Sequence, residues 1–254
     1  MSGPELTDDL GASVPLTRPV RRVISLVPSL TEAIAASCRP LLIAATDWCT
    51  HPADLDLPRV RGTKNPDLRR IVELRPDLVV SNQEENRELD VQRLRAAGVP
   101  VWVTRIQTLD EAFDSMSRLF TQALAVPEPE WLSAARAVWA PPATDRLSAA
   151  IAIWRDPWMV VGSRTFTGDL LARLGVRNVF ESAADRYPQV SVEQIVATGP
   201  QLLLLPDEPY VFSADDGPEA FPGLRTALVS GRQLTWYGPS LLAARAALET
   251  VVRL

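Results

Sequence analysis

The stretch DLRRIVELRPDLVVS, residues 67–81, predicts a short amphipathic helix, a break at Pro76 and an apolar buried strand. The stretch VEQIVATGPQLLLLP, residues 192–206, repeats this order of helix, proline break and strand. The two stretches share few identical residues, so the repeat lies in the order of their elements. Strands that alternate with helices at this spacing indicate a layered α/β fold with a largely parallel sheet.

The rest of the first half extends this pattern. Strands are expected at 23–29 and 41–46, because both runs are short and apolar. Between them, Ser29 is the expected N-cap of a helix, since Glu32 follows three residues later at the spacing of a capping box. Residues 90–104 again predict a helix followed by a strand.

The second half shows a similar order of elements. Strand-like runs span about 149–163, and either Thr165 or Thr167 is expected to cap the helix that follows them. Gly175 is the expected end of that helix, and residues 240–254 predict an amphipathic closing helix.

Residues 108–140 contain helical patterns and no strand candidate, so they separate the two α/β stretches. The expected fold class is therefore α/β, with two lobes of mainly parallel sheet bridged by a helix and a ligand cleft between the lobes. The expected divisions are a polar N-terminal lead at 1–20, an N-terminal lobe at 21–107, connecting helices at 108–145 and a C-terminal lobe at 146–254.

Composition excludes several classes of function. The chain has 254 residues, of which 46% are hydrophobic, so it can bury a sizeable core. Its net charge of −5 argues against binding to nucleic-acid phosphates, which basic proteins favour. His51 is the only histidine, which excludes metal sites built on several histidines, and two cysteines are too few for a cysteine-only zinc site.

The expected location rests on hydropathy. No apolar run reaches the ~20 residues that span a bilayer, so membrane insertion is not expected. Residues 1–22 contain acidic residues and prolines, and they lack the continuous apolar segment of a signal peptide. We therefore expect a cytoplasmic protein, unless a leader has been removed.

A series of stretches along residues 22–250 carries a further pattern: RVISLVPSLTEAI, DWCTHP, LRRIVELRPDLVVS, LRAAGVPVWVT, DPWMVVGSRTFTGDLLARLGVRNVF, YPQVSVEQIVATGPQLLLLP and WYGPSLLAARAALE. In this order they resemble the metal-chelate (class III) solute-binding proteins, the family of helical-backbone metal receptors that serve ABC importers. Within that family the cobalamin-binding branch is the most similar. The resemblance implies two lobes joined by a rigid helix, with the ligand held in a cleft between them.

The resemblance also implies the positions of the ligand loops, which are 46–52, 61–66 and 81–86 in the first lobe and 156–163, 206–212 and 234–238 in the second. A corrin or porphyrin presents broad apolar faces edged by polar groups, which aromatic and amide side chains suit. The candidate ligand-binding residues in these loops are Trp48, His51, Lys64, Asn65, Asn82, Glu84, Asn86, Trp158, Met159, Phe212, Trp236 and Tyr237.

His51 has several alternative roles. Neutral imidazole is a good ligand for cobalt or iron, so His51 is a candidate axial ligand of a bound metal. It also fits as a side chain that lines the site without coordinating, or one that makes no ligand contact. A metal pair of His51 with the thiolate of Cys49 is a further alternative, against a buried and inert thiol.

The expected function is non-catalytic binding of cobalamin, a related corrinoid or another metal tetrapyrrole, for intracellular delivery, storage or sensing. A haem or ferric-siderophore binding protein of an ABC importer is the alternative within the family. An enzyme or an interaction scaffold on the same fold stays open. Docking onto an ABC permease is doubtful, because Arg69 and Arg70 stand where importer receptors carry an acidic residue.

Overall fold

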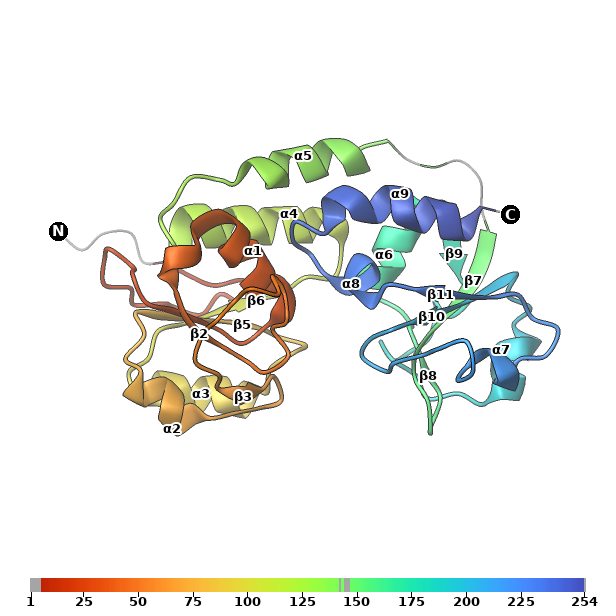
Figure 1. The fold of residues 1–254 in the computed structure, drawn as a ribbon, viewed down its shortest axis with the longest axis horizontal. Coiled ribbons are helices and arrows are strands. Elements are labelled where there is room, and N and C mark those ends of the chain that lie inside the picture. Colours follow the sequence, from red (N-terminus) through yellow and green to blue (C-terminus); the bar gives the residue numbers. More distant parts are fainter. Residues whose placement is uncertain (1–5, 142, 144–146, 254) are drawn as a thin grey trace. The chain divides into compact units, whose positions relative to one another are not determined.

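The computed structural model describes residues 6–141, 143 and 147–253 (Figure 1). The chain forms two compact units. The first contains the residues up to Arg105, Glu111–Ser133 and Tyr237–Pro239, and the second contains Ile106–Asp110, Ala134–Trp236 and the residues from Ser240 on. The expected division at 145/146 lies outside the described residues.

The first unit is built on a parallel four-stranded sheet in the order β2-β1-β5-β6. Its strands are β1 (Val23–Ser25), β2 (Leu42–Ala45), β5 (Leu78–Asn82) and β6 (Val101–Thr104). A two-stranded antiparallel hairpin is added by β3 (Arg61–Gly62) and β4 (Asn65–Pro66). The helices are α1 (Pro28–Cys38), the short 3-10 helix η1 (Arg39–Leu41), α2 (Leu68–Glu73) and α3 (Glu88–Ala96).

Helices cover both faces of this sheet. The helices α2 and α3 lie on one face and α1 on the other (Figure 1). On the α2 and α3 side, Ile71 and Leu94 are buried in one apolar cluster with strand residues such as Val79. Since both faces are buried, the strands are mainly apolar, as the sequence predicted, and their polar residues lie at their carboxyl ends.

The second unit contains a mainly parallel sheet in the order β11-β10-β7-β8, with β9 also paired to β7. Only the pair of β7 and β8 is antiparallel. The strands are β7 (Leu147–Trp154), β8 (Met159–Val160), β9 (Val176–Asn178), β10 (Leu202–Pro206) and β11 (Thr226–Val229). The prediction of two α/β lobes with mainly parallel sheets is confirmed.

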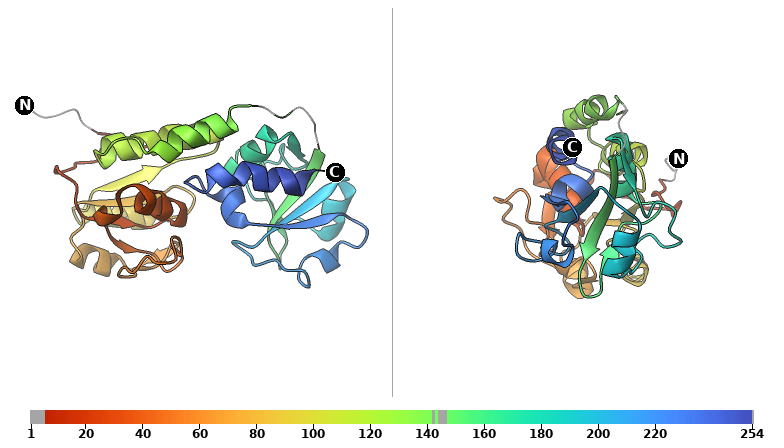
Figure 2. Two further views of the ribbon diagram at one scale, coloured as in Figure 1. Left: turned by 45° about the horizontal axis from the view of Figure 1, so that its top comes forward. Right: turned by 90° about the vertical axis from the view of Figure 1, so that its right-hand side faces the viewer.

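Helices also cover the second sheet. They are α6 (Phe166–Arg173), α7 (Val192–Ala197), the 3-10 helix η3 (Pro218–Ala220), α8 (Gly231–Thr235) and α9 (Leu241–Val252). Figures 1 and 2 show α7 and α9 on opposite faces of the sheet. The repeat of helix, break and strand that the sequence predicted is present as α2 with β5 and as α7 with β10.

Three helical elements connect the units along the chain. They are α4 (Leu109–Arg118), a π-helical turn η2 (Leu119–Ala123) that continues it, and α5 (Glu130–Trp139). Both α4 and α5 begin in one unit and end in the other. No helix in the described part of the chain is long and apolar enough to cross a membrane.

The helix starts differ in part from the sequence prediction. Ser29 is not the N-cap of α1, so that prediction is wrong: the helix begins at Pro28, and Val27 precedes it in an extended conformation without a side-chain cap. Proline is favoured at the first helical position because its missing N–H needs no partner there. Of the two candidate caps for α6, Thr165 is the observed one, and its hydroxyl accepts the Gly168 N–H at 3.2 Å.

Candidate functional site

Two of the candidate loops in the first unit follow parallel strands. Residues 46–52 come directly after β2, and 81–86 overlap the end of β5. In open α/β sheets, ligands bind outside the carboxyl ends of the strands. The paired register of β1 with both β2 and β5 brings the ends of these strands to the same edge.

Specific contacts join the three candidate loops of this unit into one surface. The Asp47 N–H donates to the Arg61 carbonyl at 2.9 Å, which attaches 46–52 to the β3-β4 hairpin. The Asn86 side chain donates to the Thr63 carbonyl at 2.9 Å, and the Lys64 ammonium donates to the carbonyl of Glu84. We call residues 46–52, 61–66 and 81–86 the first-unit loop surface.

Trp48 is the most exposed aromatic residue that the structure describes in this unit, with 66% of its surface accessible. Its indole is held close to Gly62, where a Cβ atom would lie 3.2 Å from Nε1 and 2.5 Å from Asn65 Oδ1. Glycine at position 62 therefore leaves room for the side chains of Trp48 and Asn65. The indole of Trp48 is therefore exposed to solvent while it packs against Gly62, and the exposed residues Lys64 and Asn65 belong to the same hairpin as Gly62.

Asn82 and Asn86 are buried beneath this surface. The Asn82 amide donates to Thr104 Oγ1 at 3.0 Å, and its oxygen accepts the Glu84 N–H at 2.8 Å. The Asn86 oxygen accepts the Asn82 N–H at 2.9 Å. Both side chains therefore hold the shape of the loop, and their direct hydrogen bonds to a ligand stay a prediction.

Two adjacent acidic residues belong to the same loop. Glu84 and Glu85 are half-buried, next to Lys64. Burial raises the pKa of Glu85 above the usual glutamate value, the neighbouring carboxylate of Glu84 raises it further, and the charge of Lys64 opposes both effects. Glu85 lies in the predicted ligand loop 81–86, and its contact with a ligand stays a prediction.

His51 is half-buried in the loop that follows β2, and its Nδ1 lies 3.2 Å from the Thr50 hydroxyl. The neighbouring Cys49 is fully buried, with the hydroxyls of Thr31 and Thr46 at 3.0 and 3.1 Å from its sulfur. Burial raises the pKa of the Cys49 thiol, which disfavours a thiolate metal ligand. No three His, Cys, Asp or Glu side chains of the described chain are grouped as a metal site.

In the second unit, Trp158 and Phe212 bring together two of the candidate loops. Their rings are stacked with centroids 5.7 Å apart, and Phe221 packs edge-on against Trp158 at 5.0 Å. Trp158 is 9% exposed and Phe212 is 4% exposed, and both belong to an apolar cluster of this unit. These rings hold the loops in place, and their contact with a ligand stays a prediction.

The remaining predicted residues of the second-lobe loops are Met159, Trp236 and Tyr237. Met159 is half-buried in β8, and Trp236 is buried directly after α8, with the Arg232 guanidinium 5.8 Å from its ring. Tyr237 is buried in the first unit. The loop 206–212 is joined to the start of α8, because the Gly231 N–H donates to the Asp207 carboxylate at 2.7 Å.

Tyr187 is an exposed aromatic residue that the sequence analysis missed as a site candidate. It is 36% exposed, and the segment around it pairs with the predicted loop 156–163. The Gly162 N–H donates to the Arg186 carbonyl at 2.7 Å, and the Val160 N–H donates to the Pro188 carbonyl at 3.1 Å. The signal was an aromatic residue directly before Pro188, outside any helix or strand pattern.

Comparison with known proteins gives relatives that match most of the chain. No model of a protein family matches it. The vitamin B12-binding protein of Vibrio parahaemolyticus is 30% identical over 195 residues, which are 73% of this chain and 70% of the relative.

Two solved structures share the fold. The periplasmic vitamin B12-binding protein of Vibrio cholerae is 22% identical, with a TM-score of 0.75 over 92% of this chain and 96% of that one. A periplasmic haem-binding protein from Pseudomonas aeruginosa is 23% identical, with a TM-score of 0.74 over 91% of this chain and 92% of that one.

The expected cytoplasmic location is wrong, because the similar proteins of known structure are periplasmic. The expectation rested on the missing apolar leader, and a leader is removed from a mature exported protein, so its absence is a poor guide. The expected intracellular role in delivery, storage or sensing loses its basis with that correction.

Proposed function

Because the chain belongs to the metal-chelate (class III) family of solute-binding proteins, we propose that it binds cobalamin or a related metal tetrapyrrole. The relatives that carry the name vitamin B12-binding protein support cobalamin as the first candidate. Haem is the alternative, because proteins of the same fold are known as haem-binding proteins. The ligand cleft that the resemblance implies between the lobes stays a prediction.

The observation that carries this proposal is the exposed indole of Trp48 on the first-unit loop surface. A rigid aromatic side chain covers the flat face of a macrocycle at a low cost in conformational entropy. Lys64 and Asn65 beside it offer cationic and amide donors to the polar edge of such a ring. Tyr187 is the corresponding exposed aromatic candidate of the second unit.

We also propose that the protein binds its ligand without transforming it. The relatives are named as binding proteins. The side chains of the first-unit loop surface fit recognition, since their polar groups hold the loops through hydrogen bonds. An enzyme on this fold would instead convert a candidate ligand and lose that turnover when Glu84 is replaced.

Calorimetric titration with cyanocobalamin, and in parallel with haemin, tests the proposal on the full chain. We expect Trp48→Ala to weaken binding by about tenfold, since one well-placed aromatic contact contributes on the order of 1–2 kcal/mol. The matched control is Trp131→Ala, which removes a half-buried tryptophan on α5 that lies outside all the candidate ligand loops. We expect its affinity to equal that of the wild type.

Each alternative has its own result. Saturable binding of haemin with no binding of cyanocobalamin would assign haem as the ligand. An equal loss of affinity in both tryptophan variants would show that Trp48 does not contact the ligand.

We infer that His51 lines the site without coordinating the metal. The absorption spectrum of bound cyanocobalamin should then be the same in the wild type and in His51→Ala. A spectral change in the variant would assign axial ligation to His51 instead.

Docking through α2 onto a basic socket of a permease is unfavourable. The Arg69 side chain is 88% exposed on this helix, and it pairs at 2.8 Å with Glu73 on the next turn. An exposed ion pair of this kind is weak, so a docking permease would face the guanidinium of Arg69. This positive charge would repel arginines on the permease. A permease that accepts this chain would need an acidic or neutral surface opposite Arg69.

A further inference from the structure

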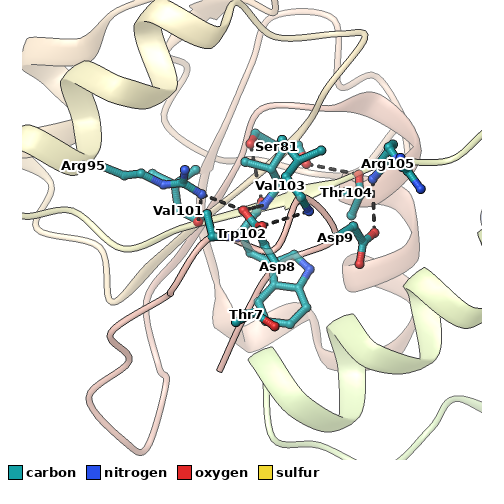
Figure 3. Close-up of polar contacts among 12 residues, drawn as sticks. Thr7, Asp8, Asp9, Ser81, Arg95, Val101, Trp102, Val103, Thr104 and Arg105 are labelled. Carbon is teal, nitrogen blue, oxygen red and sulfur yellow. Dashed lines mark hydrogen bonds and ion pairs between the residues drawn. The ribbon is translucent and has the colours of Figure 1, made fainter. Parts of the chain in front are cut away.

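The N-terminal segment Leu6–Val14 is attached to the edge strand of the first sheet. It runs beside β6, where the Asp9 N–H donates to the Val103 carbonyl at 3.1 Å (Figure 3). The segment also closes on itself, since the Val14 N–H donates to the Leu6 carbonyl at 2.8 Å and Val14 is buried. It therefore covers an edge of the sheet that would otherwise present unpaired backbone groups.

Asp8 shapes this segment. Its side chain is fully buried, and its carboxylate accepts the N–H groups of Leu10 and Ala12, each at 2.9 Å. The same carboxylate pairs with the Arg95 guanidinium at 2.6 Å and accepts the Val103 N–H at 3.3 Å (Figure 3). A buried carboxylate with this many donors is well compensated, so the segment has one defined conformation.

Asp9 contacts a different part of the chain, the segment 105–118 that leads into α4 and through it. Its carboxylate accepts the Arg105 N–H at 3.1 Å (Figure 3). It also accepts the Ser115 hydroxyl and pairs with the Arg118 guanidinium, and the Asp9 side chain is only 8% exposed. The Arg118 guanidinium in turn lies 5.3 Å from the ring centre of Trp102 in β6.

These partners have a defined place along the chain. Arg105 is the last residue of the first unit before the chain enters the second unit at Ile106. Ser115 and Arg118 belong to the part of α4 that lies in the first unit, after the chain has returned at Glu111. One carboxylate therefore contacts both the residue at which the chain leaves the first unit and the part of α4 that follows its return.

The start of α4 is fixed separately, within the second unit. The Leu109 N–H donates to the Asp169 carboxylate at 2.8 Å, and Asp110 pairs with Arg173 at 2.6 Å, so both contacts go to α6. The helix α4 is thus held near its start by α6 and farther along by Asp9.

We propose that the segment Leu6–Val14 is a clamp that fixes the connector α4 on the first unit, with Asp9 as its positioning residue. The clamp is a property of the chain itself and does not depend on the identity of the ligand. Loss of Asp9 releases residues 105–118 locally and leaves the sheet of the first unit folded.

Hydrogen–deuterium exchange of the ligand-free full chain, resolved by mass spectrometry, tests the clamp with Asp9→Ala. Exchange of peptides within 105–118 should become about tenfold faster, because the Arg105 N–H loses its acceptor and α4 loses a half-buried ion pair. Exchange in β1 and β5 should stay unchanged. The matched control is Asp56→Ala, an exposed carboxyl on the first unit outside this cluster.

A milder variant covers the case in which Asp9→Ala does not fold. Ser115→Ala removes one donor to Asp9 and should raise exchange in 111–118 by a smaller factor, with no change in β1 and β5. Unchanged exchange in 105–118 of a folded Asp9→Ala protein would overturn the clamp. An equal rise in β1 and β5 would also overturn it, because that result marks a general loss of stability.

Discussion

Trp48 and Trp158 show why residue type alone does not identify a binding side chain. Both are tryptophans in predicted ligand loops, yet Trp48 is largely exposed and Trp158 is 9% exposed within an aromatic cluster. The sequence predicted that aromatic residues gather in these loops. It does not contain the stacking of Trp158 on Phe212, because that contact depends on how two distant loops fold against each other.

Glu85 gives a prediction for the pH dependence of stability. Its pKa is raised in the folded chain, chiefly by burial. Ionisation of Glu85 therefore costs more free energy in the folded chain than in the unfolded chain, and the ionised carboxylate destabilises the fold at neutral pH. Glu85→Gln should therefore raise the thermal midpoint at pH 7 by about 2 °C. The gain should vanish below pH ~4, where the carboxyl is protonated in the folded and unfolded chains alike.

Differential scanning calorimetry of both proteins at pH 7 and pH 4 measures this effect. Glu128→Gln is the control, since Glu128 is an exposed residue of the same unit. A gain for Glu85→Gln that is equal at both pH values would contradict the effect of burial.

At the scale of elements, periodicity and proline breaks predicted most helices and strands. The pairs α2 with β5 and α7 with β10 follow the predicted order, because their apolar faces are buried against the sheets. The strand β11 was missed, since it is short and only partly buried. The structure of the N-terminal segment was missed too, because its conformation depends on Arg95 and Arg118, which lie far along the chain.

The cap of α6 gives a prediction at the same scale. Thr165→Ala removes the acceptor of the Gly168 N–H and should lower the free energy of unfolding by about 1 kcal/mol. Thr165→Ser keeps the hydroxyl and should cost much less. Urea denaturation of the three proteins measures the difference, and equal losses in both variants would show that the methyl group, and not the cap, is what matters.

At the scale of the whole molecule, the fold class and the family were predictable because many weak stretches occur in one order. The location was not predictable, since the expectation of a cytoplasmic protein is contradicted by the periplasmic proteins of the same fold. The ligand loops of the first unit form a joined surface, and the roles of individual residues on it remain proposals.

The most direct test of the proposed function is retention of cyanocobalamin by the full chain. The protein is incubated with an excess of the ligand and desalted, and the absorbance of protein and corrinoid in the eluted fraction is compared. We predict a coloured protein that carries close to one equivalent of corrinoid. A colourless protein, with all corrinoid in the low-molecular-weight fractions, would contradict cobalamin binding.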